Sequence, residues 1–188
     1  MRFLDIARND KHPVISTERS EWRNLITDME RINVYLGLGS NLGDRDVNLL
    51  RAVNLLDQAF GMHPERISRI VETPAWGFEG PDFLNLCVLY RLPRLGTPTE
   101  HGLEILRQVK AIEKAMGREE EPLFDADGRR VYHNRLIDID LLCYGAETIH
   151  TEELTVPHPL IAQRDFVKKP LLEISKPEIR TAFPEIFV

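Results

Sequence analysis

The chain has 188 residues, 43% hydrophobic and 29% charged, a composition that suits one globular domain without support from a metal or a disulfide. Its formal net charge of −6 argues against broad nucleic-acid binding, which needs Lys and Arg to neutralise phosphates, yet a few local cations and a metal ion could still hold a polyphosphate. No segment is long enough to span a membrane, and none has the apolar region of a signal peptide, so we expect a cytoplasmic protein.

Residues 1–32 are polar, mixed in charge and weakly periodic. Two interpretations remain open: an N-terminal extension that is partly helical, or a start at Met29 preceded by residues of an over-extended gene model. In both cases we expect one domain at residues 33–188. Its first strand is predicted at Asn33–Leu38, because β-forming residues there precede the turn-prone stretch GSNLGD.

A helix is predicted at Asp46–Phe60, where apolar residues recur at helical spacing. Its apolar face comprises Val47, Leu50, Val53 and Leu56, widened by Leu49 and Leu55. Two strands follow at Ile67–Thr73 and Phe83–Leu92, with the loop TPAWGFEGPD between them. Alternation places Phe83 and Asn85 on one strand face, where a ring and an amide could bind a flat heterocycle; ordinary packing explains the same pattern.

The clearest helix begins at Thr97, which suits the N-cap because Pro98 follows at the first helical position and Glu100 at the third. Its apolar stripe comprises Ile105, Val109, Ile112 and Met116, and Gly117 is placed to end the helix. The next stretch, REEEPLFDADGRRVYHN, is highly charged, and we predict no regular structure for it.

The most informative strand is predicted at Leu136–Tyr144. Because side chains alternate along a strand, Asp138 and Asp140 share one face and the isoleucines beside them share the other. Two adjacent carboxylates repel each other, a cation relieves the repulsion, and oxygen ligands favour Mg²⁺. A solvated face on a half-buried strand explains such a pattern equally well.

A short strand at Thr148–Ile149, the loop TVPHPL and a helix at Ile161–Leu172 follow. The order β-α-β-β-α-β predicts an α+β fold, a ferredoxin-like antiparallel sheet with helices packed on it in α-β-α layers. Cys87 and Cys143 lie in apolar runs, so we predict buried thiols in preference to a disulfide or a metal site.

Cationic residues flank the paired aspartates in the sequence. They are Arg118, Arg129, Arg130 and Arg135 before the pair, and His158 and Arg164 after it. Arginine binds phosphate oxygens bidentately, which suits a polyphosphate, although each residue taken singly is also explained by a surface or structural role. The sequence contains no Walker P-loop, so any ATP would be bound in another way.

Five motifs stand out together: LGLGSNLGD, ETPAWGFEGPDFLN, KAIEKAMGR, NRLIDIDLLCYG and LTVPHPLIAQRDFVKKPLLEI. In this order, over about residues 33–175, they resemble the 6-hydroxymethyl-7,8-dihydropterin pyrophosphokinase family of folate biosynthesis. The resemblance implies a ferredoxin-like enzyme that transfers the pyrophosphate of ATP to the pterin hydroxymethyl group and releases AMP. It also implies two Mg²⁺ ions, small-molecule substrates, no nucleic-acid or membrane partner, and a monomer.

The same resemblance implies roles for individual residues. Catalytic roles fall on Arg118, Arg135, Asp138 and Asp140, and the metal ligands are Asp138 and Asp140. ATP-binding roles fall on Glu113, Arg118, Arg135, His158 and Arg164. Pterin-binding roles fall on Thr73, Pro74, Trp76, Phe83, Asn85, Asp138 and Phe166, with the pterin ring between Phe83 and Phe166.

The sequence departs from the family pattern around its charged stretch. His133 and Asn134 stand in place of a Gly-Pro pair, and Glu120 in place of a second loop arginine, a role left open to Arg129 or Arg130.

Two rival functions compete with the main one. The first is an RNA-binding ferredoxin-like module, against which the acidic charge and the paired aspartates count. The second is another Mg²⁺-dependent phosphotransferase with a different substrate.

Overall fold

The computed structural model describes residues 30–118 and 134–187, and the part from Arg31 onward forms one compact unit. The predictions for the N-terminal segment before Glu30 and for most of the charged stretch lie outside the described residues. The elements in chain order are β1 (Arg31–Ser40), α2 (Arg45–Phe60), β2 (Arg66–Ile67), β3 (Val71–Thr73), β4 (Phe83–Pro93), α3 (Pro98–Ala115), β5 (Asp138–Tyr144), β6 (Ile149–His150), β7 (Thr155–Val156), α4 (Asp165–Ile174), α5 (Pro177–Ala182) and the 3-10 turn η1 (Pro184–Ile186).

The main sheet of the described chain is antiparallel, with β1 between β4 and β5. Both β2 and β3 pair with β4, so the predicted strand Ile67–Thr73 is in fact two short strands. Ser68 lies in the gap, where its hydroxyl accepts the Cys87 N–H at 2.9 Å in place of a backbone carbonyl. Strands β6 and β7 form a separate two-stranded ribbon.

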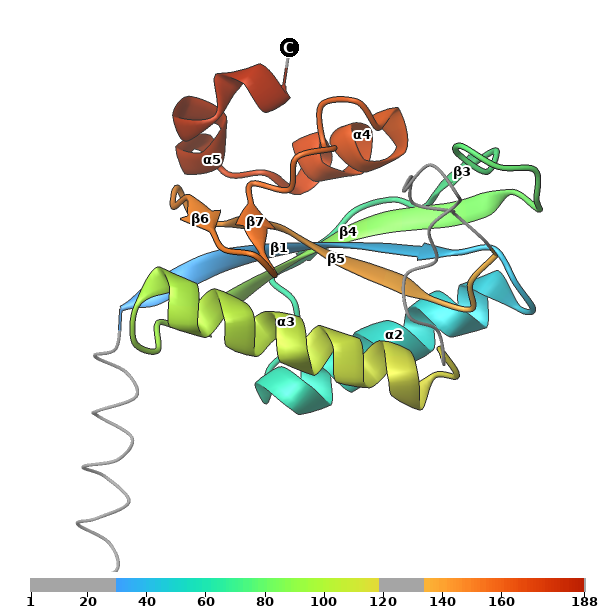
Figure 1. The fold of residues 1–188 in the computed structure, drawn as a ribbon, viewed down its shortest axis with the longest axis horizontal. Coiled ribbons are helices and arrows are strands. Elements are labelled where there is room, and N and C mark those ends of the chain that lie inside the picture. Colours follow the sequence, from blue (N-terminus) through green and yellow to red (C-terminus); the bar gives the residue numbers. More distant parts are fainter. Residues whose placement is uncertain (1–29, 119–133, 188) are drawn as a thin grey trace, which may run out of the picture. The chain divides into compact units, whose positions relative to one another are not determined.

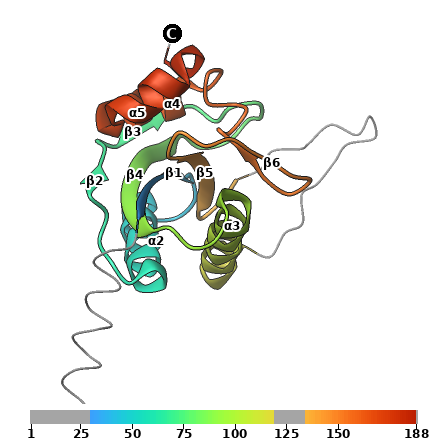
Figure 2. The ribbon, with the colours of Figure 1, turned by 90° about the vertical axis from the view of Figure 1, so that its left-hand side faces the viewer.

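The two faces of the main sheet carry different cores, because side chains alternate along each strand. Val34 and Leu36 of β1 pack with α2 and α3, whereas Tyr35 packs with α4, α5 and η1. Figures 1 and 2 show α2 and α3 on one side of the sheet and α4 and α5 on the other. The predicted α+β fold, an antiparallel sheet between layers of helices, is therefore confirmed.

Helix α2 follows the N-cap Asp44, whose carboxylate accepts the Val47 N–H at 3.2 Å. The predicted apolar face of this helix is wrong at two positions, because Val47 is 54% exposed and Leu50 is 63% exposed. The buried stripe comprises Leu49, Ala52, Val53 and Leu56. Val47 lies two residues, or about 200°, from Leu49 around the helix, so these two side chains cannot share a face.

Helix α3 begins as predicted. Thr97 Oγ1 accepts the Glu100 N–H at 3.2 Å, and the Glu100 carboxylate accepts the Thr97 N–H at 2.9 Å. The predicted apolar stripe is buried, and Gly117 follows the helix with a left-handed φ of 101°. Among the described residues, no helix is both long and apolar enough to cross a membrane.

The C-terminal elements differ more from the prediction. Helix α4 begins four residues later than expected, because the chain from Ile161 to Arg164 forms a turn in which the Arg164 N–H donates to the Ile161 carbonyl at 3.1 Å. Strand β7, helix α5 and η1 are absent from the predicted elements. Cys87 and Cys143 are buried free thiols, as predicted, and burial raises the pKa of the Cys143 thiol to about 12.

Candidate active site

A pocket opens on the α4 side of the sheet, beside the loop that follows β3. The predicted pterin-binding residues all line it: Thr73, Pro74, Trp76, Phe83, Asn85, Asp138 and Phe166. Arg135, Asp140 and Arg164 line it as well. The fold therefore brings residues from separate sequence motifs into one site. Their individual roles stay predictions, whereas their proximity is observed.

Bare backbone forms part of the pocket floor, at Gly37 and Gly39 of β1. Gly39 pairs with Asn85 on β4 and with Asp138 on β5, so the three residues form one row across the sheet. A Cβ atom at Gly39 would lie 3.0 Å from Asn85 Oδ1 and 3.5 Å from the Phe83 ring. The glycine thus leaves open the space between the aromatic and amide side chains of β4 and the aspartates of β5.

Aromatic rings form the pocket walls. Phe78 meets Phe83 edge to face, with the ring centroids 6.3 Å apart. The Arg164 guanidinium carbon lies 4.7 Å from the centroid of the Trp76 ring and 5.9 Å from that of Phe166. The pocket therefore offers flat apolar surfaces with a cation held at their border.

Asn85 places a buried amide at the base of the pocket. Its Nδ2 donates to Thr73 Oγ1 at 3.1 Å, so β3 fixes the orientation of the amide. The other amide atom, Oδ1, borders the open space above Gly39. An amide oxygen held in this way can accept a hydrogen bond from a donor on the edge of a heterocycle.

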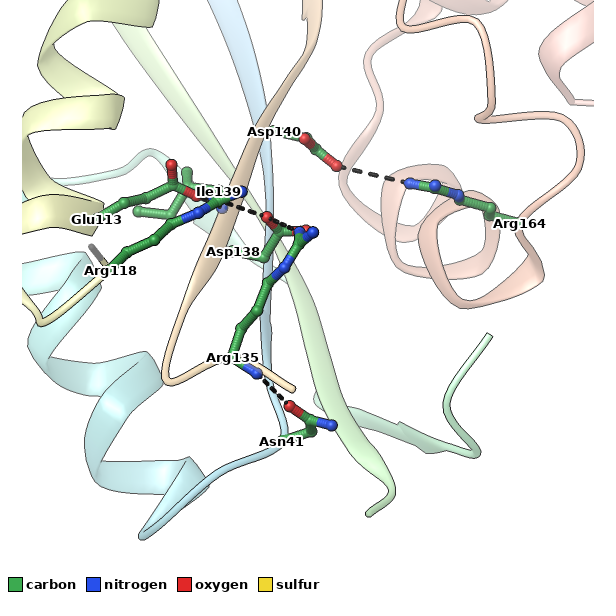
Figure 3. Close-up of polar contacts among 8 residues, drawn as sticks. All are labelled: Asn41, Glu113, Arg118, Arg135, Asp138, Ile139, Asp140 and Arg164. Atoms are coloured by element: carbon green, nitrogen blue, oxygen red, sulfur yellow. Dashed lines mark hydrogen bonds and ion pairs between the residues drawn. The ribbon is translucent and has the colours of Figure 1, made fainter. Parts of the chain in front are cut away.

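Asp138 lies between two arginines (Figure 3). Its Oδ1 accepts hydrogen bonds from Arg118 Nη1 at 3.0 Å and from Arg135 Nη1. Arg118 Nη1 also donates to Glu113 Oε1, and the same oxygen accepts the Ile139 N–H at 2.8 Å. Glu113 thus connects the end of α3 to the start of β5 and holds Arg118 beside the first aspartate.

Burial sets the charge state of this cluster. Desolvation raises the pKa of Glu113 to about 7, and the Asp138 carboxylate adds to the rise, whereas Arg118 opposes it. Burial alone would lower the pKa of Arg118, but the two carboxylates raise it overall. The guanidinium therefore stays charged, while the Glu113 carboxyl exchanges a proton near neutral pH.

Asp140 lies on the same face of β5 as Asp138, as the alternation predicts. Its Oδ2 is 3.7 Å from Arg164 Nη1, too far for a hydrogen bond. Desolvation raises the pKa of Asp140, and Asp138 raises it further, while His158, Arg164 and Arg135 oppose the rise. Burial beside a second carboxylate therefore disfavours the charged form of Asp140, and a bound cation would offset that cost.

The paired aspartates fit a hard cation such as Mg²⁺, which prefers carboxylate oxygens. The side chains of Asp138 and Asp140 keep 26% and 34% of their surface exposed, so an ion could reach them. In residues 30–118 and 134–187, no group of three or more His, Cys, Asp or Glu could hold a metal by itself. An ion here would therefore take its remaining ligands from water and substrate phosphates.

The other predicted ATP-binding residues surround the aspartates without lining the pocket. They are Glu113, Arg118 and His158. The His158 N–H donates to the Leu142 carbonyl at 2.9 Å, and its Nδ1 accepts the Leu160 N–H at 3.2 Å. These bonds fix the imidazole beside β5. The candidate loop arginines Arg129 and Arg130 lie outside the described residues.

Two features of the site were not predicted from the sequence. One is the glycine floor, although glycine and leucine alternate in LGLGS, which is the pattern of a strand with one empty face. The other is Asn41, whose Oδ1 accepts the Arg135 N–H at 2.7 Å. No local pattern indicates this contact, because the two residues are 94 positions apart.

Comparisons with known proteins agree with this fold. A family model described as 7,8-dihydro-6-hydroxymethylpterin-pyrophosphokinase (HPPK) matches residues 35–176. The chain is 42% identical over 142 residues to the 2-amino-4-hydroxy-6-hydroxymethyldihydropteridine pyrophosphokinase of Aquifex aeolicus, covering 75% of this chain and 79% of that protein. It is 36% identical over 141 residues to the Bacillus subtilis protein of the same name, covering 74% and 76%.

A solved structure of HPPK-DHPS in complex with substrates shares the fold with a TM-score of 0.54 at 17% identity, covering 82% of this chain and 43% of that one. The fold and the relatives together define a pyrophosphate-transferring enzyme of folate synthesis. The chain belongs to the 7,8-dihydro-6-hydroxymethylpterin-pyrophosphokinase family. It therefore transfers the pyrophosphate of ATP to the hydroxymethyldihydropterin, which sets aside both rival functions.

Proposed function

We propose that the pocket binds the pterin, and that Asp138 and Asp140 hold two Mg²⁺ ions between ATP and the pterin hydroxymethyl group. One observation carries the proposal: the predicted pterin-binding residues and both predicted metal ligands line the same pocket. Gly39 separates Asn85 from Asp138 in one cross-strand row. A ring bound over Asn85 would therefore extend its substituent toward the aspartates.

The pterin ring lies between Phe83 and Phe166 in this proposal, with Pro74 and Trp76 at the rim of the pocket. Aromatic side chains bind flat rings through large contact areas at little entropic cost, which suits a heterocycle. Asn85, whose amide is oriented by Thr73 of β3, forms a hydrogen bond with the edge of the ring. This geometry leaves the hydroxymethyl group on the side of the pocket where the carboxylates and arginines gather.

On the aspartate side, the chain supplies cations for the triphosphate. Arg118 and Arg135 bind phosphate oxygens, Glu113 holds Arg118 in place, and His158 and Arg164 flank the second aspartate. The buried Nε of Arg135 has no hydrogen-bond partner among the described residues, which suits an acceptor supplied by substrate. Bound Mg²⁺ neutralises charge on the transferred group, and phosphoryl transfer depends mainly on such neutralisation and on positioning.

Several finer properties belong to the same proposal. The reaction releases AMP, depends on Mg²⁺, and is carried out by a cytoplasmic monomer with no nucleic-acid partner. The net charge of −6 and the paired aspartates support the last point. Light scattering of the purified protein measures its mass, and ATP turnover with and without added RNA measures any effect of nucleic acid.

The proposal is tested by AMP release from ATP in the presence of the pterin and Mg²⁺. Asp138→Asn and Asp140→Asn should each abolish measurable turnover, because each removes one negative oxygen ligand, while the circular dichroism spectrum stays that of the wild type. Asp165→Asn changes an exposed aspartate of α4 outside the pocket and should keep full activity. Normal turnover in either pocket variant, or in EDTA without added metal, would remove the metal role.

A further inference from the structure

Asn41 joins three segments of the chain beside the site, and Figure 3 shows its contact with one of them, at Arg135. Its Oδ1 accepts the Arg135 N–H at 2.7 Å, and its own N–H donates to the Arg135 carbonyl at 3.1 Å. Its Nδ2 donates to the Pro81 carbonyl at 3.2 Å and to Asn134 Oδ1 at 2.8 Å. One side chain thus ties the end of β1 to the end of the loop that carries Trp76 and to the residues that lead into β5.

Backbone groups fix the orientation of the Asn41 amide. A backbone N–H only donates and a carbonyl only accepts, so Oδ1 faces Arg135 and Nδ2 faces Pro81. Asn41 is 2% exposed, and a buried amide whose two ends are both bonded has one favourable orientation. Asn134 is exposed by comparison, so its side chain can be changed without opening the core.

Gly80 leaves the space that this arrangement needs. A Cβ atom at Gly80 would lie 2.5 Å from Asn134 Oδ1 and 2.8 Å from the Phe78 ring, both closer than van der Waals contact allows. Phe78 in the pocket wall and Asn134 before Arg135 therefore lie next to the same glycine.

Arg135 is the residue that these contacts hold. Its guanidinium donates to Asp138 and lines the pocket, while both of its backbone polar groups bond to Asn41. A long side chain loses conformational entropy when it binds a ligand, and a fixed backbone reduces that loss. The position of Arg135 in the pocket thus depends on a residue that does not itself line the pocket.

We propose that Asn41 and Asn134 form a clasp, defined by the hydrogen bond from Asn41 Nδ2 to Asn134 Oδ1, which positions Arg135 for the reaction and links it to the loop over the pterin pocket. Both are positioning residues, because neither is among the residues that line the pocket. The inference rests on the proposed role of Arg135 toward the transferred phosphates.

Asn134 provides the test, because two variants of similar size separate hydrogen bonding from shape. Asn134→Asp keeps the accepting oxygen, whereas Asn134→Leu removes it. Steady-state kinetics should give Asn134→Leu a kcat lower by about fivefold, the effect of one lost hydrogen bond, and a raised KM for the pterin, with Asn134→Asp within about twofold of the wild type. Gly80→Ala should resemble Asn134→Leu, because its methyl group displaces the Asn134 side chain.

A double variant shows whether the clasp acts through Arg135. Arg135→Met keeps most of the side-chain volume but removes the charge, so its own loss of kcat measures the proposed role of Arg135. Adding Asn134→Leu to Arg135→Met should then cause no further loss. Multiplied losses in the double variant, or wild-type kinetics in Asn134→Leu, overturn the clasp alone. A wild-type kcat in Arg135→Met overturns the proposed role of Arg135, and the clasp with it.

Discussion

Phe83 presents its ring to the pocket from the first position of β4. Phe83→Ala should weaken pterin binding by about tenfold, because a stacking surface is lost, and should leave the fold intact because the ring is only half-buried. Isothermal titration calorimetry with the pterin and an unreactive ATP analogue measures the change in affinity.

Phe187→Ala is the matched control for this prediction. Phe187 is also half-buried, but it packs against the α4–α5 core and does not line the pocket. Its removal should lower the free energy of unfolding and leave the pterin affinity unchanged. If Phe83→Ala binds the pterin as tightly as the wild type does, the ring does not stack on Phe83.

Residues that face the pocket from strands could be predicted from the sequence. Residues whose role depends on contacts with distant parts of the sequence could not. Alternation is a local rule, so it correctly grouped Phe83 with Asn85 and Asp138 with Asp140. Asn41 illustrates the other case. It lies in a turn that is ordinary in sequence, and its importance arises only when the fold brings Pro81 and Arg135 to it.

At the scale of elements, helix α3 has the best-defined start in the described chain. Thr97→Ala should lower the free energy of unfolding by about 1 kcal/mol, because the Glu100 N–H loses its acceptor, while Thr97→Ser should keep most of that stability. Urea denaturation measures both variants. The value of kcat should stay unchanged, since the cap is at the opposite end of α3 from Glu113. Equal stability of the alanine and serine variants would contradict a capping role.

Element length explains which elements could be predicted. Helix α3 and strand β4 are long enough to show their repeats, and both were found close to their true bounds. Strand β7 has two residues and helix α5 has six, so both are too short for a periodic signal. Strand β6 is equally short, yet it overlaps the short strand predicted at Thr148–Ile149. In α2 the spacing predicts a helix correctly but places its apolar face wrongly, because the small Ala52 is fully buried whereas the larger Val47 is exposed.

At the scale of the whole molecule, stability should depend on pH through a buried histidine. His101 Nδ1 lies 2.8 Å from the Tyr144 hydroxyl, and desolvation lowers the pKa of His101 below its usual 6.5. The unfolded chain then binds the proton more readily, so this contribution to stability is complete above pH 6.5 and is lost as the pH falls below it. Glu113, whose pKa is raised, has the opposite sign: stability falls as the pH rises from 4.5 toward 7.

His101→Asn separates the two effects, because the variant lacks the histidine but retains Glu113. Urea unfolding of both proteins between about pH 5 and about pH 7.5 gives the difference in their free energies of unfolding. The advantage of the wild type over the variant should shrink toward the acidic end. A difference that stays constant with pH would show that His101 titrates alike in the folded and unfolded chains.

The glycine floor has a consequence for inhibition. With the pterin bound as proposed, a flat inhibitor placed over Gly39 would rest on the same bare backbone as the substrate, with no side chain beneath it that could distinguish the two. Any side chain gained at Gly39 would enter the space next to Asn85 and Phe83 and obstruct both molecules alike. A substitution at Gly39 that excludes an inhibitor should therefore also abolish enzyme activity. Mutations that give resistance and preserve turnover should instead lie in the pocket walls.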